Sequence, residues 1–255
     1  MKAMVLAAGL GTRLRPLTDD RPKALVTLAG KTLLEITLLN LRSYGVDEVI
    51  VNVHHFADLV CDYLDENGNF GMHIEISHED DQLLDTGGGL KKAEWFFLEE
   101  GGNEPFILHN VDVLSTIDLA RMMRQHAEHN ALATLAVQDR ETSRYLLFDE
   151  NGQLCGRRKG RDGQAEMARP AAHSQALAFC GIHVISPRLL WEMREEGAFS
   201  IIDAYLRLAE RGEKIAAFRA DEYYWRDLGR PENIAEAERN LESEADSGES
   251  PRPLH

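Results

Sequence analysis

The chain has 255 residues, of which 43 are Asp or Glu and 28 are Lys or Arg, giving a formal net charge of −15. This acidic balance argues against general binding to nucleic acid or to an anionic membrane surface, so neither partner is expected. No apolar run reaches the roughly 18 residues that a membrane-spanning helix needs. Cys61, Cys155 and Cys180 lie far apart without a CxxC pair. This pattern excludes a cysteine zinc site and a disulfide framework, and it is typical of a reduced, cytoplasmic protein.

Strands and helices alternate along the first half of the chain. The hydrophobic pattern predicts strands over 3–8, 48–53, 73–77, 105–109 and 132–137, and helices over 33–41, 56–64, 86–97 and 119–129. This order predicts an α/β fold with a mixed, mostly parallel sheet and helices on both faces.

The second half is less regular. The pattern predicts a hairpin of 145–148 and 153–156 around Asn151-Gly152, followed by a mobile polar loop over 157–172. Further expected elements are a strand over 177–185, helices over 187–194, 201–211 and 231–241, and a short strand over 215–218. No linker divides the chain. Residues 1–242 are therefore expected to form a single domain, and 243–255 a disordered acidic tail.

The first predicted strand leads into a glycine loop. The apolar run over residues 3–8 ends at Gly9 and Gly11, and the cations Arg13 and Lys23 follow. Glycines let the backbone turn sharply and approach a ligand, and the N–H groups of such a turn can bind an anion. A bare GxG also fits an ordinary tight turn. A Walker loop is excluded because no GxxxxGK[ST] string is present, and a dinucleotide fingerprint because position 14 is not glycine.

A longer string is much more specific. GLGTRLRPLT, followed by Pro22-Lys23, resembles the phosphate loop of the sugar-1-phosphate nucleotidyltransferase family, which reads G-x-G-T-R-x-x-P-x-T and then P-K. The resemblance covers the chain up to about residue 241 and implies a Rossmann-like (GT-A-like) fold. It also implies catalytic roles for Arg13 and Lys23. The nucleotide would be framed by Leu6, Ala7, Ala8, Gly9, Gly11 and Thr12.

Two carboxylates stand in further matching motifs. Asp112 follows the predicted strand 105–109, where a carboxylate can bind Mg²⁺ or cap a helix or turn. Asp227 lies in WRDLG, where it can bind a metal or form a salt bridge with Arg226 or Arg230. The family's motifs are N-x-D, often with Gly in the middle where this chain has Val, and W-x-D-x-G. The resemblance therefore implies that Asp112 and Asp227 are the two Mg²⁺ ligands.

The remaining candidates surround the substrates. LLDTGGGLKKA resembles the family's base-contacting segment, L-x-T-G/A-G, which implies that Gly87 and Gly88 bind the nucleotide; a flexible helix start is the alternative. Many members have E-K-P near Lys159, whereas this chain reads RRKG, so Lys159 and Arg158 are equal candidates for the sugar phosphate, or are simply solvated. The resemblance assigns the sugar-phosphate side to Asn110, Lys159 and Gly181.

Together these motifs imply transfer of a nucleoside monophosphate from a nucleoside triphosphate to a sugar 1-phosphate, with Mg²⁺ as cofactor. The LLDTGGGL form favours UTP and N-acetylmuramic acid 1-phosphate, and thus nucleotide-sugar biosynthesis for the cell wall. The alternatives are a mannose- or heptose-1-phosphate guanylyltransferase and a non-catalytic nucleotide-sugar-binding regulator. A glycosyltransferase is disfavoured because no D-x-D follows a strand. The expected partners are the two substrates, and the expected assembly is a monomer or small homo-oligomer.

Overall fold

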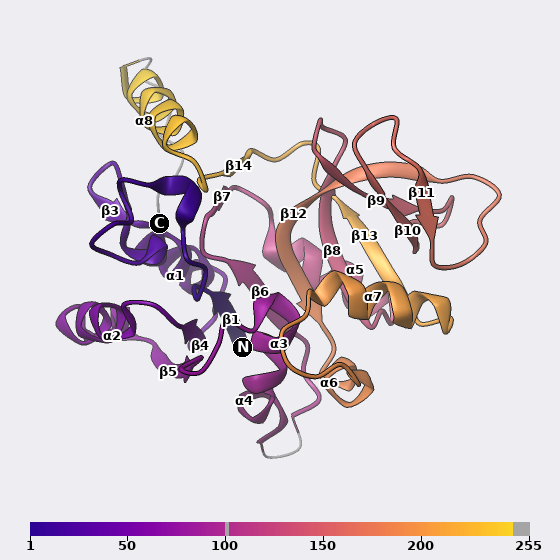
Figure 1. Ribbon diagram of the computed structural model, residues 1–255, viewed down its shortest axis with the longest axis horizontal. Helices are drawn as coiled ribbons and strands as arrows, with labels where there is room; N and C mark the ends of the chain where they lie inside the picture. Colours follow the sequence, from indigo (N-terminus) through magenta and orange to yellow (C-terminus); the bar gives the residue numbers. More distant parts are fainter. Residues whose placement is uncertain (100–101, 247–255) are drawn as a thin grey trace. The chain divides into compact units, whose positions relative to one another are not determined.

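The computed structural model describes residues 1–99 and 102–246. The chain groups into two compact units, whose elements are labelled in Figure 1. Unit 1 consists of Met1–Leu83, His109–Thr116 and the described residues from Tyr224 onwards. Unit 2 consists of Leu84–Leu108 and Ile117–Tyr223. The chain thus leaves unit 1 twice and returns to it twice.

Unit 1 has a parallel core. β1 (Lys2–Leu6), β4 (Glu48–Val53) and β5 (His73–His78) are parallel and follow the order β1-β4-β5. The register aligns Leu6 with Asn52, so the carboxyl ends of β1 and β4 lie side by side. The three middle residues of β1 are fully buried, as expected for a parallel strand that is covered on both faces.

Helices of unit 1 follow the strands. α1 (Leu33–Ser43) begins at an N-cap, in which the Thr32 hydroxyl accepts a hydrogen bond from the Glu35 backbone N–H at 3.0 Å. The other elements of unit 1 are α2 (Ala57–Glu66), α8 (Pro231–Asp246), the 3-10 helices η1 (Thr12–Leu14), η2 (Lys23–Leu25) and η3 (Gly68–Gly71), and the antiparallel strand pairs β2 (Thr27–Leu28) with β3 (Lys31–Thr32) and β7 (Val113–Ser115) with β14 (Trp225–Asp227).

Unit 2 is built around one long strand. β12 (Gln175–Ile185) pairs antiparallel with β9 (Arg144–Phe148) over residues 175–178, and with β8 (Ala133–Gln138) over residues 178–179 and 183–185. Its register against β8 shifts around Gly181, whose φ of 74° lies in the left-handed region. This bend leaves residues 180–182 out of the ladder with β8.

Short elements complete unit 2. β10 (Leu154–Lys159) is antiparallel to both β9 and β11 (Ala165–Met167), and β13 (Ile215–Arg219) is parallel to β8. The helices of unit 2 are α3 (Asp85–Lys92), α4 (Glu94–Leu98), α5 (Leu119–His129), α6 (Arg188–Glu192) and α7 (Ile201–Glu210). β6 (Phe106–Asn110) carries the chain from unit 2 back into unit 1.

Parallel pairing in unit 1 and mixed pairing in unit 2, with helices between the strands, confirm the predicted α/β fold and mixed sheet. The prediction of one mobile loop over 157–172 is wrong, because β10 extends to Lys159 and β11 lies within the segment. A polar sequence can form an edge hairpin where its side chains pair, as Arg157 and Glu166 do across β10 and β11. The helix predicted over 86–97 is two helices that meet at Ala93.

The predicted acidic tail is described only at its start. α8 continues to Asp246, past the proposed domain end at residue 242, and 247–255 lie outside the described residues. The domain boundary and the disorder of the tail stay predictions.

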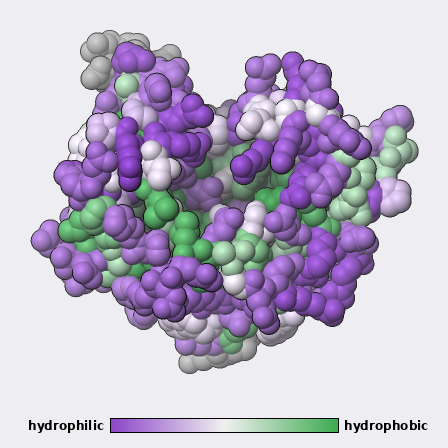
Figure 2. Space-filling model, in the orientation of Figure 1, coloured by the Kyte–Doolittle hydropathy of each residue, from purple (hydrophilic) through white to green (hydrophobic). Residues whose placement is uncertain are grey.

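Hydrophilic side chains cover most of the face seen in Figure 2. Within the described residues, no helix is both long and apolar enough to span a membrane. The large hydrophobic side chains that are most exposed are Leu10, Leu17, Leu59, Trp95, Met167 and Trp191. Two of these, Leu10 and Leu17, belong to the glycine loop after β1.

Candidate active site

The start of the glycine loop is fixed by a buried polar chain. The Ala7 N–H donates to Asn52 Oδ1 at 2.7 Å, and Asn52 Nδ2 donates to Glu79 Oε1 at 2.7 Å. Asn52 and Glu79 are only 3% and 1% exposed. This chain ties the end of β1 to the ends of β4 and β5, so the loop leaves the sheet in a defined direction.

The loop then folds back on itself at Gly11. Its φ is 63°, and a Cβ there would lie 2.9 Å from Thr18 Cγ2 and 3.1 Å from Lys23 Cβ. The Thr18 hydroxyl donates to the Gly11 carbonyl at 2.9 Å. Gly11 is therefore required by both backbone conformation and space, and the turn brings Lys23 beside the loop. At Gly9, by contrast, a Cβ would have no described atom within 4 Å, so packing does not require glycine there.

Asp112 lies between β6 and β7, against the glycine loop. The Val111 N–H donates to the Leu6 carbonyl at 3.2 Å, which attaches this segment to the end of β1. The Asp112 carboxylate forms an ion pair with Lys23, and these side chains are only 14% and 13% exposed. No helix begins at Asp112, so the helix-cap alternative is wrong, but Asp112 does lie in the turn between β6 and β7 that the other alternative expects.

Asp227 is held beside Asp112 by the backbone. It pairs with Val113 in the β14–β7 ladder, and the Leu228 N–H donates to the Asp112 carbonyl at 2.7 Å. Its own Oδ1 accepts a hydrogen bond from the Gly229 N–H at 2.6 Å. Within the described part of the chain, no ion pair joins Asp227 to a neighbouring arginine; Arg226 pairs with Glu236 at 2.7 Å instead.

Gly229 marks the point where these side chains converge. A Cβ at this position would lie 2.7 Å from Asp227 Oδ1, 3.0 Å from Arg13 Nη2 and 3.1 Å from Asp112 Oδ2. Two carboxylates and a guanidinium, from three separate segments of unit 1, therefore surround one small space. Like charges at such range repel, and Arg13 and Lys23 offset that repulsion.

His109 is buried and lies near enough to Asp112 to feel its charge. Its Nδ1 lies 2.8 Å from the Asn110 carbonyl oxygen. Its Nε2 is buried and has no hydrogen-bond partner among the described residues. Burial lowers the pKa of His109 to about 4. The imidazole is therefore neutral at physiological pH and adds no charge to the cluster.

Two predicted nucleotide-binding glycines have a packing role in unit 2. The N–H groups of Gly87 and Gly88 donate to the Phe199 carbonyl at 2.9 and 3.3 Å. A Cβ at Gly87 would lie 2.3 Å from Phe199 Cε2, and one at Gly88 would lie 2.3 Å from the Gly197 carbonyl oxygen. Both glycines are buried, so the alternative of a flexible helix start does not describe them. Contact with a nucleobase stays a prediction.

The sugar-phosphate candidates divide between the units. Asn110 ends β6 in unit 1, whereas Lys159 ends β10 in unit 2 and is exposed. Gly181 occupies the bend of β12, where its positive φ already requires glycine. The structure thus brings Arg13, Lys23, Asp112 and Asp227 together, and places Lys159 and Gly181 in the other compact unit.

Comparison with known proteins decides the family, since residues 2–244 match the nucleotidyl transferase family. This chain belongs to that family. It is 36% identical over 251 residues to N-acetylmuramate alpha-1-phosphate uridylyltransferase of Caulobacter vibrioides, covering 94% of this chain and 96% of the relative. The protein of the same description from Neisseria meningitidis serogroup B is 30% identical, covering 93% and 97%.

Solved structures support the fold assignment. A putative glucose-1-phosphate thymidylyltransferase from Bacillus anthracis aligns with a TM-score of 0.76 at 17% identity, covering 94% of each chain. The predicted Rossmann-like class is thereby confirmed. The chain is a sugar-1-phosphate nucleotidyltransferase and takes part in nucleotide-sugar biosynthesis.

Nucleotidyl transferases generally use a divalent metal such as Mg²⁺. Asp112 and Asp227 fit that ion, because Mg²⁺ prefers oxygen ligands and binds through one or two carboxylates plus substrate phosphates and water. Within the described residues, no group of three or more His, Cys, Asp or Glu side chains could hold a metal by itself. The two carboxylates of this nucleotidyltransferase would therefore need phosphate and water oxygens to complete the coordination.

Sequence reasoning missed some residues that shape this site. Asn52, Glu79 and Thr18 fix the glycine loop, and Gly229 leaves room between the two carboxylates. Gly229 could have been found, because it is the glycine of the W-x-D-x-G string. Asn52 and Glu79 lie in no such string, and only the hydrogen bonds from Ala7 to Asn52 and from Asn52 to Glu79 show their role.

Proposed function

We propose that this nucleotidyltransferase transfers UMP from UTP to N-acetylmuramic acid 1-phosphate, forming a nucleotide sugar and releasing pyrophosphate. The observation that carries the choice of substrates is the 36% identity, over nearly the whole of both chains, to a uridylyltransferase described as acting on that sugar phosphate. The convergence of Arg13, Asp112 and Asp227 beside Gly229 supports the class of reaction.

In this reaction a phosphate oxygen of the sugar 1-phosphate attacks the α-phosphorus of the nucleotide. A new P–O bond forms as the bond from the α-phosphorus to its bridging oxygen breaks, and pyrophosphate carries the electron pair away. A phosphate oxygen is already a competent nucleophile, so no general base is required. The protein would contribute positioning and neutralisation of charge.

The cations of unit 1 have distinct proposed roles. Arg13 would bind the triphosphate, and Lys23 would contact the phosphates at the reacting centre. Lys23 is held against Asp112 and so lies at the carboxylate pair. Asp112 and Asp227 would hold Mg²⁺, which when bound supplies charge stabilisation to the phosphates.

The other residues would surround the two substrates. The proposed nucleotide-binding residues are Leu6, Ala7, Ala8, Gly9, Gly11, Thr12, Gly87 and Gly88. The proposed contacts to the sugar 1-phosphate substrate, to its sugar or to its phosphate, are Asn110, Lys159 and Gly181.

A pyrophosphate-release assay tests the substrates. UTP, GTP, CTP and dTTP are each combined with N-acetylmuramic acid 1-phosphate, N-acetylglucosamine 1-phosphate, glucose 1-phosphate and mannose 1-phosphate. The highest kcat/KM is expected for UTP with N-acetylmuramic acid 1-phosphate. A higher value for GTP with mannose 1-phosphate would contradict the proposal and favour a guanylyltransferase.

A further inference from the structure

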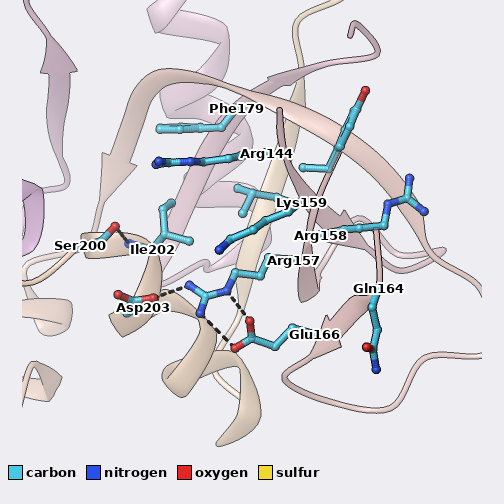
Figure 3. Close-up of a pocket in the computed structure, with 12 residues that line it drawn as sticks. Arg144, Arg157, Arg158, Lys159, Gln164, Glu166, Phe179, Ser200, Ile202 and Asp203 are labelled. Carbon is cyan, nitrogen blue, oxygen red and sulfur yellow. Dashed lines mark hydrogen bonds and ion pairs between the residues drawn. The ribbon is translucent and has the colours of Figure 1, made fainter. Parts of the chain in front are cut away.

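Unit 2 contains a cavity of about 740 Å³ between the β9–β10 hairpin and the start of α7 (Figure 3). Four cationic side chains and two carboxylates line it. Its lining thus has a positive formal charge, although the protein as a whole carries −15.

Both carboxylates in the lining are already bound to Arg157. Its Nε and Nη2 donate to the two oxygens of Glu166 at 2.7 and 3.0 Å, and its Nη1 donates to Asp203. Such a paired guanidinium joins β10 to β11 and α7 and has little charge left for a ligand. With Arg157 the two carboxylates keep one net negative charge, and Glu166 interacts electrostatically with Lys159, so the three remaining cations of the cavity are offset only in part.

Arg158 turns to the other side of the hairpin (Figure 3). Successive side chains of a strand point to opposite faces, so Arg158 is separated from both of its neighbours in β10. Its guanidinium carbon lies 5.6 Å from the centre of the Tyr145 ring. The sequence leaves Lys159 and Arg158 as equal candidates for contact with the sugar phosphate. The pleat of β10 places them on opposite faces of the strand, with Lys159 on the same face as Arg157.

Arg144 and Lys159 lie directly opposite each other in the β9–β10 register. Like charges at opposed positions of an antiparallel pair destabilise it, unless an anion lies between them. Within the described part of the chain, neither side chain forms a salt bridge. Figure 3 shows both reaching into the cavity on the side of Ile202, with Arg144 lying along Phe179.

We infer that the Arg144–Lys159 pair binds a carboxylate carried on the sugar ring of the acceptor, a second anionic group besides its 1-phosphate. This rests on the proposed function, whose acceptor bears a lactyl ether with such a carboxylate. A guanidinium and an ammonium on facing strands can share one carboxylate through charge-assisted hydrogen bonds. Phe179 and Ile202 supply apolar surface for the methyl group of the lactyl ether.

The test compares two acceptors that differ only in the lactyl ether. Wild type, Arg144→Gln, Lys159→Gln and the control Arg161→Gln are assayed with UTP and either N-acetylmuramic acid 1-phosphate or N-acetylglucosamine 1-phosphate. Arg161 is an exposed cation in the turn between β10 and β11, and it pairs with Glu141 outside the cavity. Losing one charge-assisted hydrogen bond should lower the preference for the lactyl sugar on the order of tenfold, mainly through its KM.

The outcomes separate this inference from the proposed function. Equal losses for both sugars in Arg144→Gln and Lys159→Gln would mean that the pair binds the shared 1-phosphate, which would overturn the inference. The inference would also be overturned if wild type and both variants prefer the lactyl sugar to the same degree. In that case the proposed function would stand. A wild type that prefers a neutral sugar 1-phosphate would overturn both. Loss of preference in the two variants, with preference kept in Arg161→Gln, supports the inference.

Discussion

Lys23 and Asp112, which are 89 positions apart in the sequence, form an ion pair that is largely shielded from solvent. The pair joins the glycine loop to the segment after β6, and Asp227 reaches the same place through β14. One carboxylate is thus balanced by a lysine, while the other is held by a backbone N–H. The two carboxylates therefore differ in what their removal should do to the fold.

Gly229→Ala should disturb the site more than the fold. The added methyl group would lie between the two carboxylates and Arg13, and it would push their side chains apart. We expect the Mg²⁺ concentration for half-maximal rate to rise on the order of tenfold, with a stability change of about 1 kcal/mol or less. Mg²⁺ titration of the rate and thermal melting measure the two effects. An unchanged Mg²⁺ dependence would mean that the carboxylates do not share an ion.

Gly87→Ala should destabilise unit 2, because the new methyl group would overlap the Phe199 ring. Overpacking of this kind costs about 1–3 kcal/mol. The substitution should cost less in a Phe199→Ala background, where the ring is absent, and denaturant unfolding of the four proteins gives this coupling. If stability is kept while the KM for UTP rises, Gly87 acts through the nucleotide instead of through packing.

Protonation of His126 should make the protein sensitive to acid. This buried imidazole lies 2.9 Å from the hydroxyls of Thr134 and Ser186, and Ser186 donates its own proton to the Ala131 carbonyl. Nε2–H therefore donates to Ser186, and Nδ1 accepts from Thr134. Protonation of Nδ1 would remove that acceptor, and burial lowers the pKa of His126 to about 4.

The direction of the pH effect on stability follows from the pKa of His126 in the folded and unfolded protein. An unfolded histidine, with a pKa near 6.5, binds its proton before the folded one does, so stability is complete above about pH 6.5 and falls towards pH 4. His126 should account for roughly 2 kcal/mol of lost stability at pH 5. Urea unfolding at pH 7.5 and pH 5 should show a smaller loss in His126→Gln than in wild type. Equal losses would show that His126 titrates normally in the folded protein.

The sequence predicts local elements better than long-range contacts. Apolar runs identify β1 and β4, because a buried parallel strand needs an uninterrupted hydrophobic run, and the alternation of apolar and polar residues identifies β5. The β11 strand was missed, since its residues are polar and exposed and its pairing is seen only in three dimensions. Short strands β7 and β14 carry no pattern of their own, although their pairing brings Asp227 to Asp112.

The site was predicted through motif resemblance and not through hydrophobic pattern. Arg13, Lys23, Asp112 and Asp227 were each found in a string, and the structure brings all four together in unit 1. The Lys23–Asp112 ion pair could not be predicted, because neither string contains information on its partner. The packing role of Gly87 likewise depends on Phe199, more than a hundred positions later in the chain.

The central claim is that Asp112 and Asp227 form one Mg²⁺ site, and the most direct test compares Asp227→Asn with wild type. Asn keeps the acceptor for the Gly229 N–H and removes a charge that repels Asp112, so metal-free stability should stay the same or rise slightly. The Mg²⁺-dependent rate should fall by a factor on the order of 10² or more, since metal charge neutralisation contributes several kcal/mol. If Asp227→Asn melts earlier without metal and still turns over at the wild-type rate in saturating Mg²⁺, the claim is wrong.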